Sequence, residues 1–139
     1  MSGWVPRLLV CLSAAAVLAQ QVGLYGQSGP VQPDWFPAAD KVQHGLGFAL
    51  PMFLVLTTLE SYAARAGRTL RPLSAAVIAA VFAANAVVSE LYQARPGSGR
   101  SGDPADALAD LAGIALGWLA YRLVRGRWFS TRLRGQGGE

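Results

Sequence analysis

Cysteine, histidine and charged residues are all scarce in this chain of 139 residues. The single cysteine, Cys11, excludes an intramolecular disulfide bond. The chain has no CxxC pair and no pair of histidines at helical spacing, so its motifs predict no metal site. Charged residues make up 14% of the chain, against roughly 25% in soluble domains. This deficit argues against an ordinary soluble protein.

Long apolar runs account for the low charge content. Hydrophobic residues form 53% of the chain and gather into four runs, so we predict an integral membrane protein. The net charge of +4 and the isoelectric point near 9.8 could indicate a nucleic-acid partner. However, the basic residues lie beside the apolar runs and no nucleic-acid motif is present. A membrane protein with no nucleic-acid partner is therefore the better interpretation.

Each of the four runs is long enough, at about 20 residues, to cross a bilayer as a helix. We place the spans at about 5–24, 41–61, 72–93 and 104–124, which predicts a single all-α domain over 1–139. The first run could also be a signal peptide. Its n-region holds only Arg7 and its apolar character continues past the small residues, which favours an uncleaved span. We expect 125–139 to form a basic tail that is disordered or lies on anionic lipid.

The distribution of basic residues predicts the orientation of the bundle. With four spans, both termini and the middle loop share one side, which carries nine of the Lys and Arg residues. The other side carries three, Lys41, Arg95 and Arg100. By the positive-inside rule both termini lie in the cytoplasm, in a multi-pass protein of the plasma (inner) membrane.

A stripe of acids and glycines opens the last span. Positions i, i+4, i+7 and i+11 share one helix face, and here they are Asp106, Asp110, Gly113 and Gly117. The glycines form a GxxxG pair, so this face should pack against another helix. Asp103 before Pro104 also suits a helix cap, with Asp106 completing a capping box. Capping explains Asp110 poorly, because it lies about two turns into the helix.

Polar residues of two other spans belong to the same end of the bundle. Asp40, Lys41 and His44 open the second span, where Asp40 could act as its cap, and Glu90 and Gln93 close the third. Ionisable residues within membrane segments are functional candidates by default. Because three distant segments bring such groups to one depth, we predict an extracytoplasmic polar site. Its predicted ligand-binding residues are Asp40, Lys41, His44, Glu90, Gln93, Arg100, Asp103, Asp106 and Asp110.

This pattern resembles the VanZ-like family of small integral membrane proteins, named after a protein associated with teicoplanin resistance. The resemblance covers about 40–117 and rests on three groups of residues. They are Asp40-Lys41-Val42-Gln43-His44, then Glu90 with Gln93, then Arg100, Asp103, Asp106, Asp110, Gly113 and Gly117. Asp110 stands where the family usually has Asn, which adds a possible charge. The resemblance implies a cell-envelope role near glycopeptide antibiotics and implies no particular reaction.

Three functions are compatible with these residues. We rank first the binding or remodelling of a lipid-linked envelope component or glycopeptide, with Lys41 and Arg100 contacting a phosphate head group. The second is structural, in which the polar groups pair with one another to set helix register. The third is an enzyme, in which the catalytic candidates are His44, Glu90, Asp106 and Asp110.

In the enzyme, His44 would act as general base, Glu90 or Asp110 would orient it or act as the acid, and Arg100 would hold an anion. The same His and carboxylates could hold a divalent metal, although this ligand set is unspecific. Membrane lipid is the expected partner in every case. The sequence identifies no cofactor and no oligomeric state.

Overall fold

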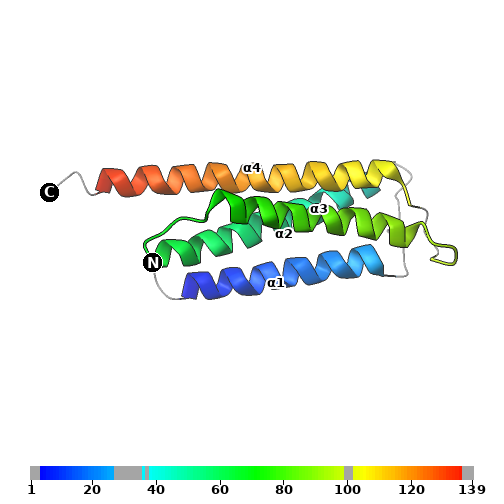
Figure 1. Cartoon of the computed structure of the whole chain (residues 1–139), viewed down its shortest axis with the longest axis horizontal. Helices are drawn as coiled ribbons and strands as arrows, with labels where there is room; N and C mark the ends of the chain where they lie inside the picture. Colours follow the sequence, from blue (N-terminus) through cyan, green and yellow to red (C-terminus); the bar gives the residue numbers. More distant parts are fainter. Residues whose placement is uncertain (1–3, 27–35, 37, 99–101, 136–139) are drawn as a thin grey trace.

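The computed structural model describes residues 4–26, 36, 38–98 and 102–135, with side chains described as far as Arg127. Over these residues the chain forms four helices, α1 (Trp4–Tyr25), α2 (Ala39–Arg65), α3 (Pro72–Gln93) and α4 (Pro104–Gly135). The helices alternate in direction, so α1 and α3 end where α2 and α4 begin (Figure 1). We call this the acidic end, because it holds Asp40, Glu90 and Asp103. The other is the arginine end, which holds Arg65, Arg71 and Arg125.

All four helices are long and apolar enough to cross a membrane, which confirms the predicted all-α bundle of four spans. Large apolar side chains point outward, since Val22, Leu73 and Leu108 are 73%, 71% and 68% exposed. Asp110, two residues after Leu108, is 0% exposed. Ionisable groups inside and apolar groups outside suit a bundle surrounded by lipid. The chain therefore has the architecture of a multi-pass membrane protein.

Two helices extend beyond their predicted spans. α2 begins at Ala39 and continues to Arg65, and Gly67, with φ of +67°, makes the turn toward α3. α4 continues through Gly135, so residues 125–135 of the expected tail belong to this helix. No proline follows Pro104, and one glycine inside a helix, here Gly126, costs only about 1 kcal/mol. Residues 136–139 lie outside the described part of the chain.

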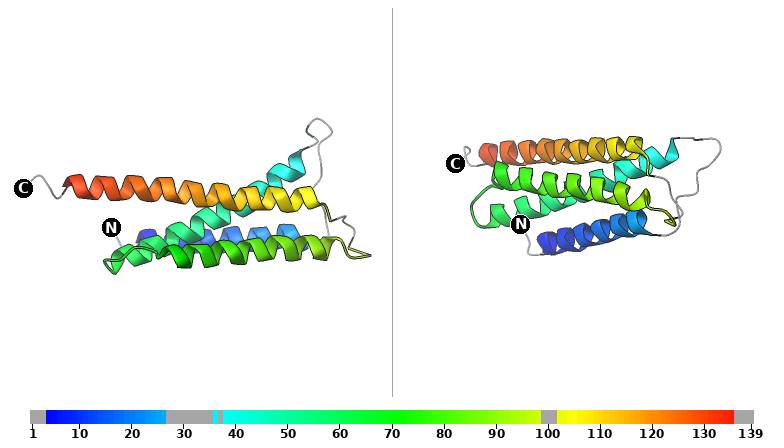
Figure 2. Two further views of the ribbon diagram at one scale, coloured as in Figure 1. Left: turned by 45° about the horizontal axis from the view of Figure 1, so that its top comes forward. Right: turned by 45° about the vertical axis from the view of Figure 1, so that its right-hand side comes forward.

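α2 packs against each of the other three helices and carries much of the core. Phe48, Met52 and Leu56 recur every four residues along one face of α2 and are fully buried. Phe48 meets Phe82 of α3 edge to face, with ring centroids 6.4 Å apart. α2 lies obliquely across α4 (Figure 2). Because of this central position, polar residues near either end of α2 can meet partners from several helices.

Glycines let α2 and α4 touch backbone to backbone. A Cβ atom at Gly113 would overlap the carbonyl oxygen of Gly45, and one at Gly117 would overlap that of Ala49. The shared helix face of Asp106, Asp110, Gly113 and Gly117 predicted that the two glycines pack against another helix. In the structure both glycines lie at the contact with α2. This close approach turns the acids of the same stripe toward α2.

Candidate functional site

Lys41 joins the start of α2 to the start of α4. Its Nζ donates hydrogen bonds to Asp40 Oδ2 at 3.0 Å, Asp103 Oδ2 at 2.6 Å and Asp106 Oδ1 at 2.6 Å. We call these four residues the lysine cluster. The side chains of Lys41 and Asp103 are 31% and 44% exposed, so the cluster reaches the surface of the acidic end. The hydrogen bond from Lys41 lowers the pKa of Asp103, which lies just before the fourth span.

Asp103 caps α4, as its position before Pro104 predicted. Its Oδ1 accepts the backbone N–H of Ala105 at 2.9 Å. The backbone N–H of Asp103 donates to Glu90 Oε2 at 3.0 Å. The predicted capping box, in which Asp106 would accept that N–H, is therefore wrong, because Lys41 holds the Asp106 carboxylate instead. Glu90 takes over the bond and ties the end of α3 to the start of α4.

Asp40 does not cap α2, contrary to the prediction. The N-cap residue is Ala38, whose side chain cannot accept a hydrogen bond. Asp40 lies in the first turn of the helix, where its Oδ1 accepts the N–H of Lys41 at 2.8 Å. A carboxylate at this position favours the positive end of the helix dipole. Asp40 therefore acts as a partner of Lys41.

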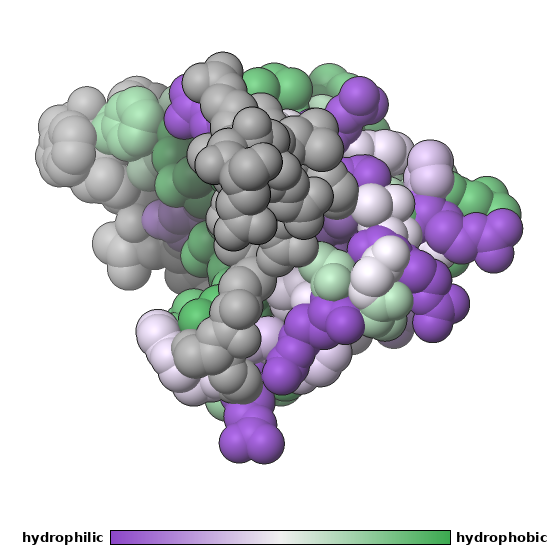
Figure 3. All heavy atoms as spheres, turned by 90° about the vertical axis from the view of Figure 1, so that its left-hand side faces the viewer, coloured by the Kyte–Doolittle hydropathy of each residue, from purple (hydrophilic) through white to green (hydrophobic). Residues whose placement is uncertain are grey.

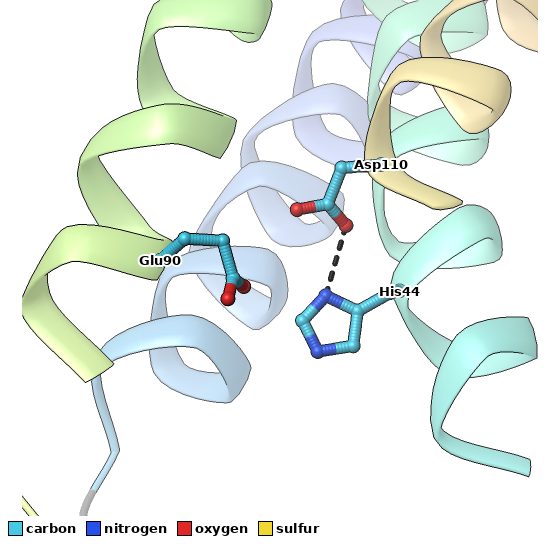
Figure 4. A group of neighbouring side chains, drawn as sticks. All are labelled: His44, Glu90 and Asp110. Carbon is cyan, nitrogen blue, oxygen red and sulfur yellow. Dashed lines mark hydrogen bonds and ion pairs between the residues drawn. The ribbon is translucent and has the colours of Figure 1, made fainter. Parts of the chain in front are cut away.

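Three buried side chains meet below the lysine cluster, toward the middle of the bundle. His44 comes from α2, Glu90 from α3 and Asp110 from α4, and Figure 4 shows their polar groups pointing toward one another. His44 Nδ1 lies 2.9 Å from Asp110 Oδ1, and His44 Nε2 lies 3.7 Å from Asp106 Oδ2. One nitrogen or oxygen atom from each of the three side chains lies within 4.8 Å of the other two. We call His44, Glu90 and Asp110 the histidine cluster.

Two carboxylate oxygens of the histidine cluster are buried without a hydrogen bond. Glu90 Oε1 and Asp110 Oδ2 have no partner among the residues that the structure describes. Leaving a buried polar group unpaired costs about 1–3 kcal/mol, and more when the group is charged. In the lysine cluster, by contrast, three carboxylates share one ammonium group. The capacity for a further ligand therefore lies in the histidine cluster.

Two predicted site residues do not belong to these clusters as described. Gln93 Nε2 donates to the carbonyl oxygen of Leu24 at 3.0 Å, so this amide links α3 to the end of α1. Arg100 lies outside the described residues. The remaining seven predicted residues form the two clusters, namely Asp40, Lys41, His44, Glu90, Asp103, Asp106 and Asp110.

A cavity of about 380 Å³ lies between α1 and α2 and reaches the histidine cluster. His44 forms part of its wall, together with Gln20 and Gln43. Gln20 is 6% exposed, and its Nε2 has no hydrogen-bond partner in the described part of the chain. Ala16 and Pro51 line the cavity farther from the acidic end. Gln20 is not among the residues that the sequence predicted for the site.

The arginine end holds a third polar group that sequence reasoning missed. Glu60 Oε2 accepts hydrogen bonds from the Tyr121 hydroxyl at 2.7 Å and from the backbone N–H of Leu70 at 3.1 Å. Arg125 Nε lies 3.7 Å from the same oxygen. Hydrophilic side chains also occur around the edge of this end (Figure 3). A carboxylate inside the apolar run of α2 was the available signal, but two of its partners, Tyr121 and Arg125, come from α4, far away in the sequence.

The histidine cluster has the chemical groups of a general base or of a binding site. A carboxylate bonded to Nδ1 can orient an imidazole and stabilise its charged form. The cavity lies next to the same ring, since His44 belongs to both the cavity wall and the histidine cluster. No family model, no curated protein and no solved structure matches the chain.

Proposed function

We propose that this protein binds a lipid-linked component of the cell envelope at the extracytoplasmic side of the plasma membrane. As a VanZ-like protein, it would thereby alter susceptibility to glycopeptide antibiotics such as teicoplanin. The observation that carries the proposal is the cavity between α1 and α2, which joins an apolar interior to the polar side chains of the acidic end. A molecule with a polar head and an apolar tail fits such a gradient.

The dimensions and lining of the cavity support an amphipathic ligand. Its volume of about 380 Å³ falls in the range of small-molecule sites, which is roughly 300–1,000 Å³. Ala16, Leu50 and Pro51 would contact an apolar chain, whereas Gln20 and His44 would contact a head group. Because the unpaired Nε2 of Gln20 is a buried donor, it favours a ligand with an acceptor oxygen, such as a phosphate.

Lys41 is less available to a head group than its charge suggests. An ammonium group has three N–H donors, and Lys41 directs hydrogen bonds to three carboxylates. A phosphate would have to displace one of them before it could bind Lys41. We therefore expect a ligand to contact Gln20, Gln43 and His44 first, with the lysine cluster holding α2 and α4 together above them.

The VanZ-like assignment is supported by the way in which its motifs converge. The residues that carry the resemblance come from the start of α2, the end of α3 and the start of α4, and seven of them form the two clusters. The excess of Lys and Arg at the arginine end supports a cytoplasmic location for that end. Under this orientation the cavity and both clusters face envelope components outside the cell.

Filling the cavity tests the proposal. A Cβ atom at Gly47 has no neighbour within 4 Å, so Gly47→Leu should extend into the cavity without striking backbone. The matched control is Ala80→Leu, which adds a similar side chain on an exposed face of α3. We would compare retained polyprenyl-phosphate lipid by native mass spectrometry after purification in lipid nanodiscs, and teicoplanin susceptibility in cells that express each variant.

The wild type and Ala80→Leu should retain the lipid and change teicoplanin susceptibility equally. Gly47→Leu should retain at least tenfold less lipid and lose the effect on susceptibility. Equal lipid retention by all three proteins would mean that the lipid does not bind in this cavity. If no protein retained lipid or altered susceptibility, the proposed function would be wrong.

A further inference from the structure

We infer that the histidine cluster is a binding site for one divalent first-row transition-metal ion, Zn²⁺ or Mn²⁺, with His44, Glu90 and Asp110 as ligands. The inference goes beyond the proposed function and does not depend on it, because its ligand is an inorganic ion and its residues need no lipid. The three residues come from three helices, which is why no metal motif appears in the sequence.

The spacing of the potential ligand atoms fits such an ion. Ligands bound at about 2.0–2.2 Å from a metal lie about 3 Å from one another when they meet at right angles. His44 Nδ1 and Asp110 Oδ1 are already 2.9 Å apart. One potential ligand atom of Glu90 lies within 4.8 Å of one such atom of His44 and one of Asp110, so at most a small movement of its side chain is needed to complete the site. Glu90 Oε1 is free to bind the ion, because that oxygen has no hydrogen bond among the described residues.

Unpaired buried oxygens are the second observation that indicates a cation. Glu90 is 9% exposed and Asp110 is 0% exposed, yet each has one oxygen without a partner in the part of the chain that the structure describes. With a neutral imidazole, two ionised carboxylates give the histidine cluster a charge of −2. A divalent cation balances this charge and gives Glu90 Oε1 its missing partner, and an Asp110 carboxylate that binds the ion through both oxygens would give Oδ2 a partner as well.

The carboxylate of Asp106 is placed to orient His44 for metal binding. A histidine that binds a metal through one nitrogen usually donates its other ring N–H to a carboxylate or carbonyl group, which sets its orientation. If Nδ1 binds the ion, Nε2 carries the proton, and Asp106 Oδ2 lies 3.7 Å from Nε2. Lys41 in turn holds Asp106 through its other oxygen. The lysine cluster would thus keep the imidazole in the tautomer that the ion requires.

The mixed nitrogen and oxygen ligand set determines the class of ion. Imidazole suits zinc, iron, copper and nickel, whereas carboxylates also suit manganese, magnesium and calcium. Ca²⁺ takes oxygen ligands, and Mg²⁺ favours carboxylates and water. One imidazole with two carboxylates therefore favours Zn²⁺ or Mn²⁺ over Mg²⁺ or Ca²⁺.

The experiment uses full-length protein that carries no polyhistidine tag, purified in detergent and stripped with a chelator. Zn²⁺ would be titrated and its stoichiometry measured by elemental analysis after desalting. X-ray absorption at the zinc edge would then report the ligand atoms. His44 is the only histidine in the chain, so a single imidazole in the spectrum identifies the site without any substitution.

We expect one Zn²⁺ per chain, bound by one imidazole and oxygen atoms. Asp110→Asn and Glu90→Gln, which keep side-chain size, should each weaken binding by about 10–100-fold or more, since even supporting residues have effects of that size. The matched control is Glu60→Gln, which removes an equally buried carboxylate at the arginine end and should bind as the wild type does. Less than one ion per chain in the wild type, or a zinc spectrum without imidazole, overturns the inference. Equal affinity in folded Asp110→Asn and Glu90→Gln also overturns it.

Discussion

At the scale of single residues, His44 and Lys41 lie three positions apart on α2 yet form hydrogen bonds with different acids. Lys41 binds three carboxylates near the surface, whereas His44 binds Asp110 in the interior. The carboxylates of the lysine cluster, near the surface, are paired with Lys41. The buried histidine cluster leaves two carboxylate oxygens without partners among the described residues. This division separates a set of contacts that holds helices together from a set that can accept a ligand.

Asp103→Asn should slightly lower thermal stability at neutral pH and have no such effect in acid. Lys41 lowers the pKa of Asp103, so the stabilising charge is fully present above the ordinary carboxyl pKa of about 4. It is lost as the pH falls through the lower pKa of the folded state. The effect is small because the Asp103 side chain is 44% exposed.

The measurement is the apparent melting temperature of both proteins in detergent from neutral pH to about pH 3. Asparagine is as good a helix cap as aspartate, so the difference between the two proteins isolates the ion pair from the cap. The difference should shrink toward acid pH. A difference that stays constant over this range would mean that capping, not the charge of Asp103, is what the substitution changes.

At the scale of helices, the contact between α2 and α4 controls the geometry of the acidic end. Gly113 and Gly117 lie on the same stripe as Asp106 and Asp110, so a rotation of α4 would move all four together. The backbone contact at Gly45 and Ala49 leaves no room for such a rotation. The helix contact therefore positions the acids toward Lys41 and His44.

Gly117→Leu should destabilise the bundle by at least about 1–3 kcal/mol, the usual cost of overpacking a close contact. Its side chain would have to enter space taken by the Ala49 carbonyl and by Met52 Cβ, which lies 3.0 Å from an added Cβ. Gly126→Leu is the control on the same helix, because an added Cβ there meets nothing within 4 Å. Thermal unfolding in detergent should show a marked loss for the first variant and little change for the second. Equal melting temperatures would contradict the packing seen at Gly117.

At the scale of the whole molecule, the orientation in the membrane decides which compartment the clusters face. Topology reporters fused after Gly67 and Gly99 should report the cytoplasm and the exterior, respectively. The physical reason is the excess of Lys and Arg on the side of Gly67, since cytoplasmic loops retain positive charge. The reverse result would place both clusters in the cytoplasm and would exclude envelope components as ligands.

The apolar runs determined the number of helices and most of their limits. A span needs about 20 apolar residues, and each of the four runs supplies them and is helical in the structure. The end of α4 was missed because hydropathy marks where a span leaves the apolar layer, and a helix can continue into polar sequence. Helical spacing also predicted which residues of α4 share a face and that its glycines meet another helix.

The depth of each polar residue in its span was also readable from the sequence. His44, Glu90 and Asp110 lie at corresponding distances from the ends of their spans, so their convergence on one end could be predicted. Which groups pair with one another could not, because pairing depends on the rotation and crossing of helices far apart in the sequence. Lys41 meets Asp103 and Asp106 across more than 60 residues, with separations of 62 and 65.

Only the tertiary structure decided which polar groups are satisfied and which are not. Gln93 was expected beside Glu90 in the site, but its amide binds the end of α1. Glu60 acquires its partners only where α2 approaches α4 at the arginine end. The cavity beside His44 likewise exists only because α1 packs on α2 there. Composition and periodicity place a residue on a face and at a depth, whereas the packing of helices determines what that residue touches.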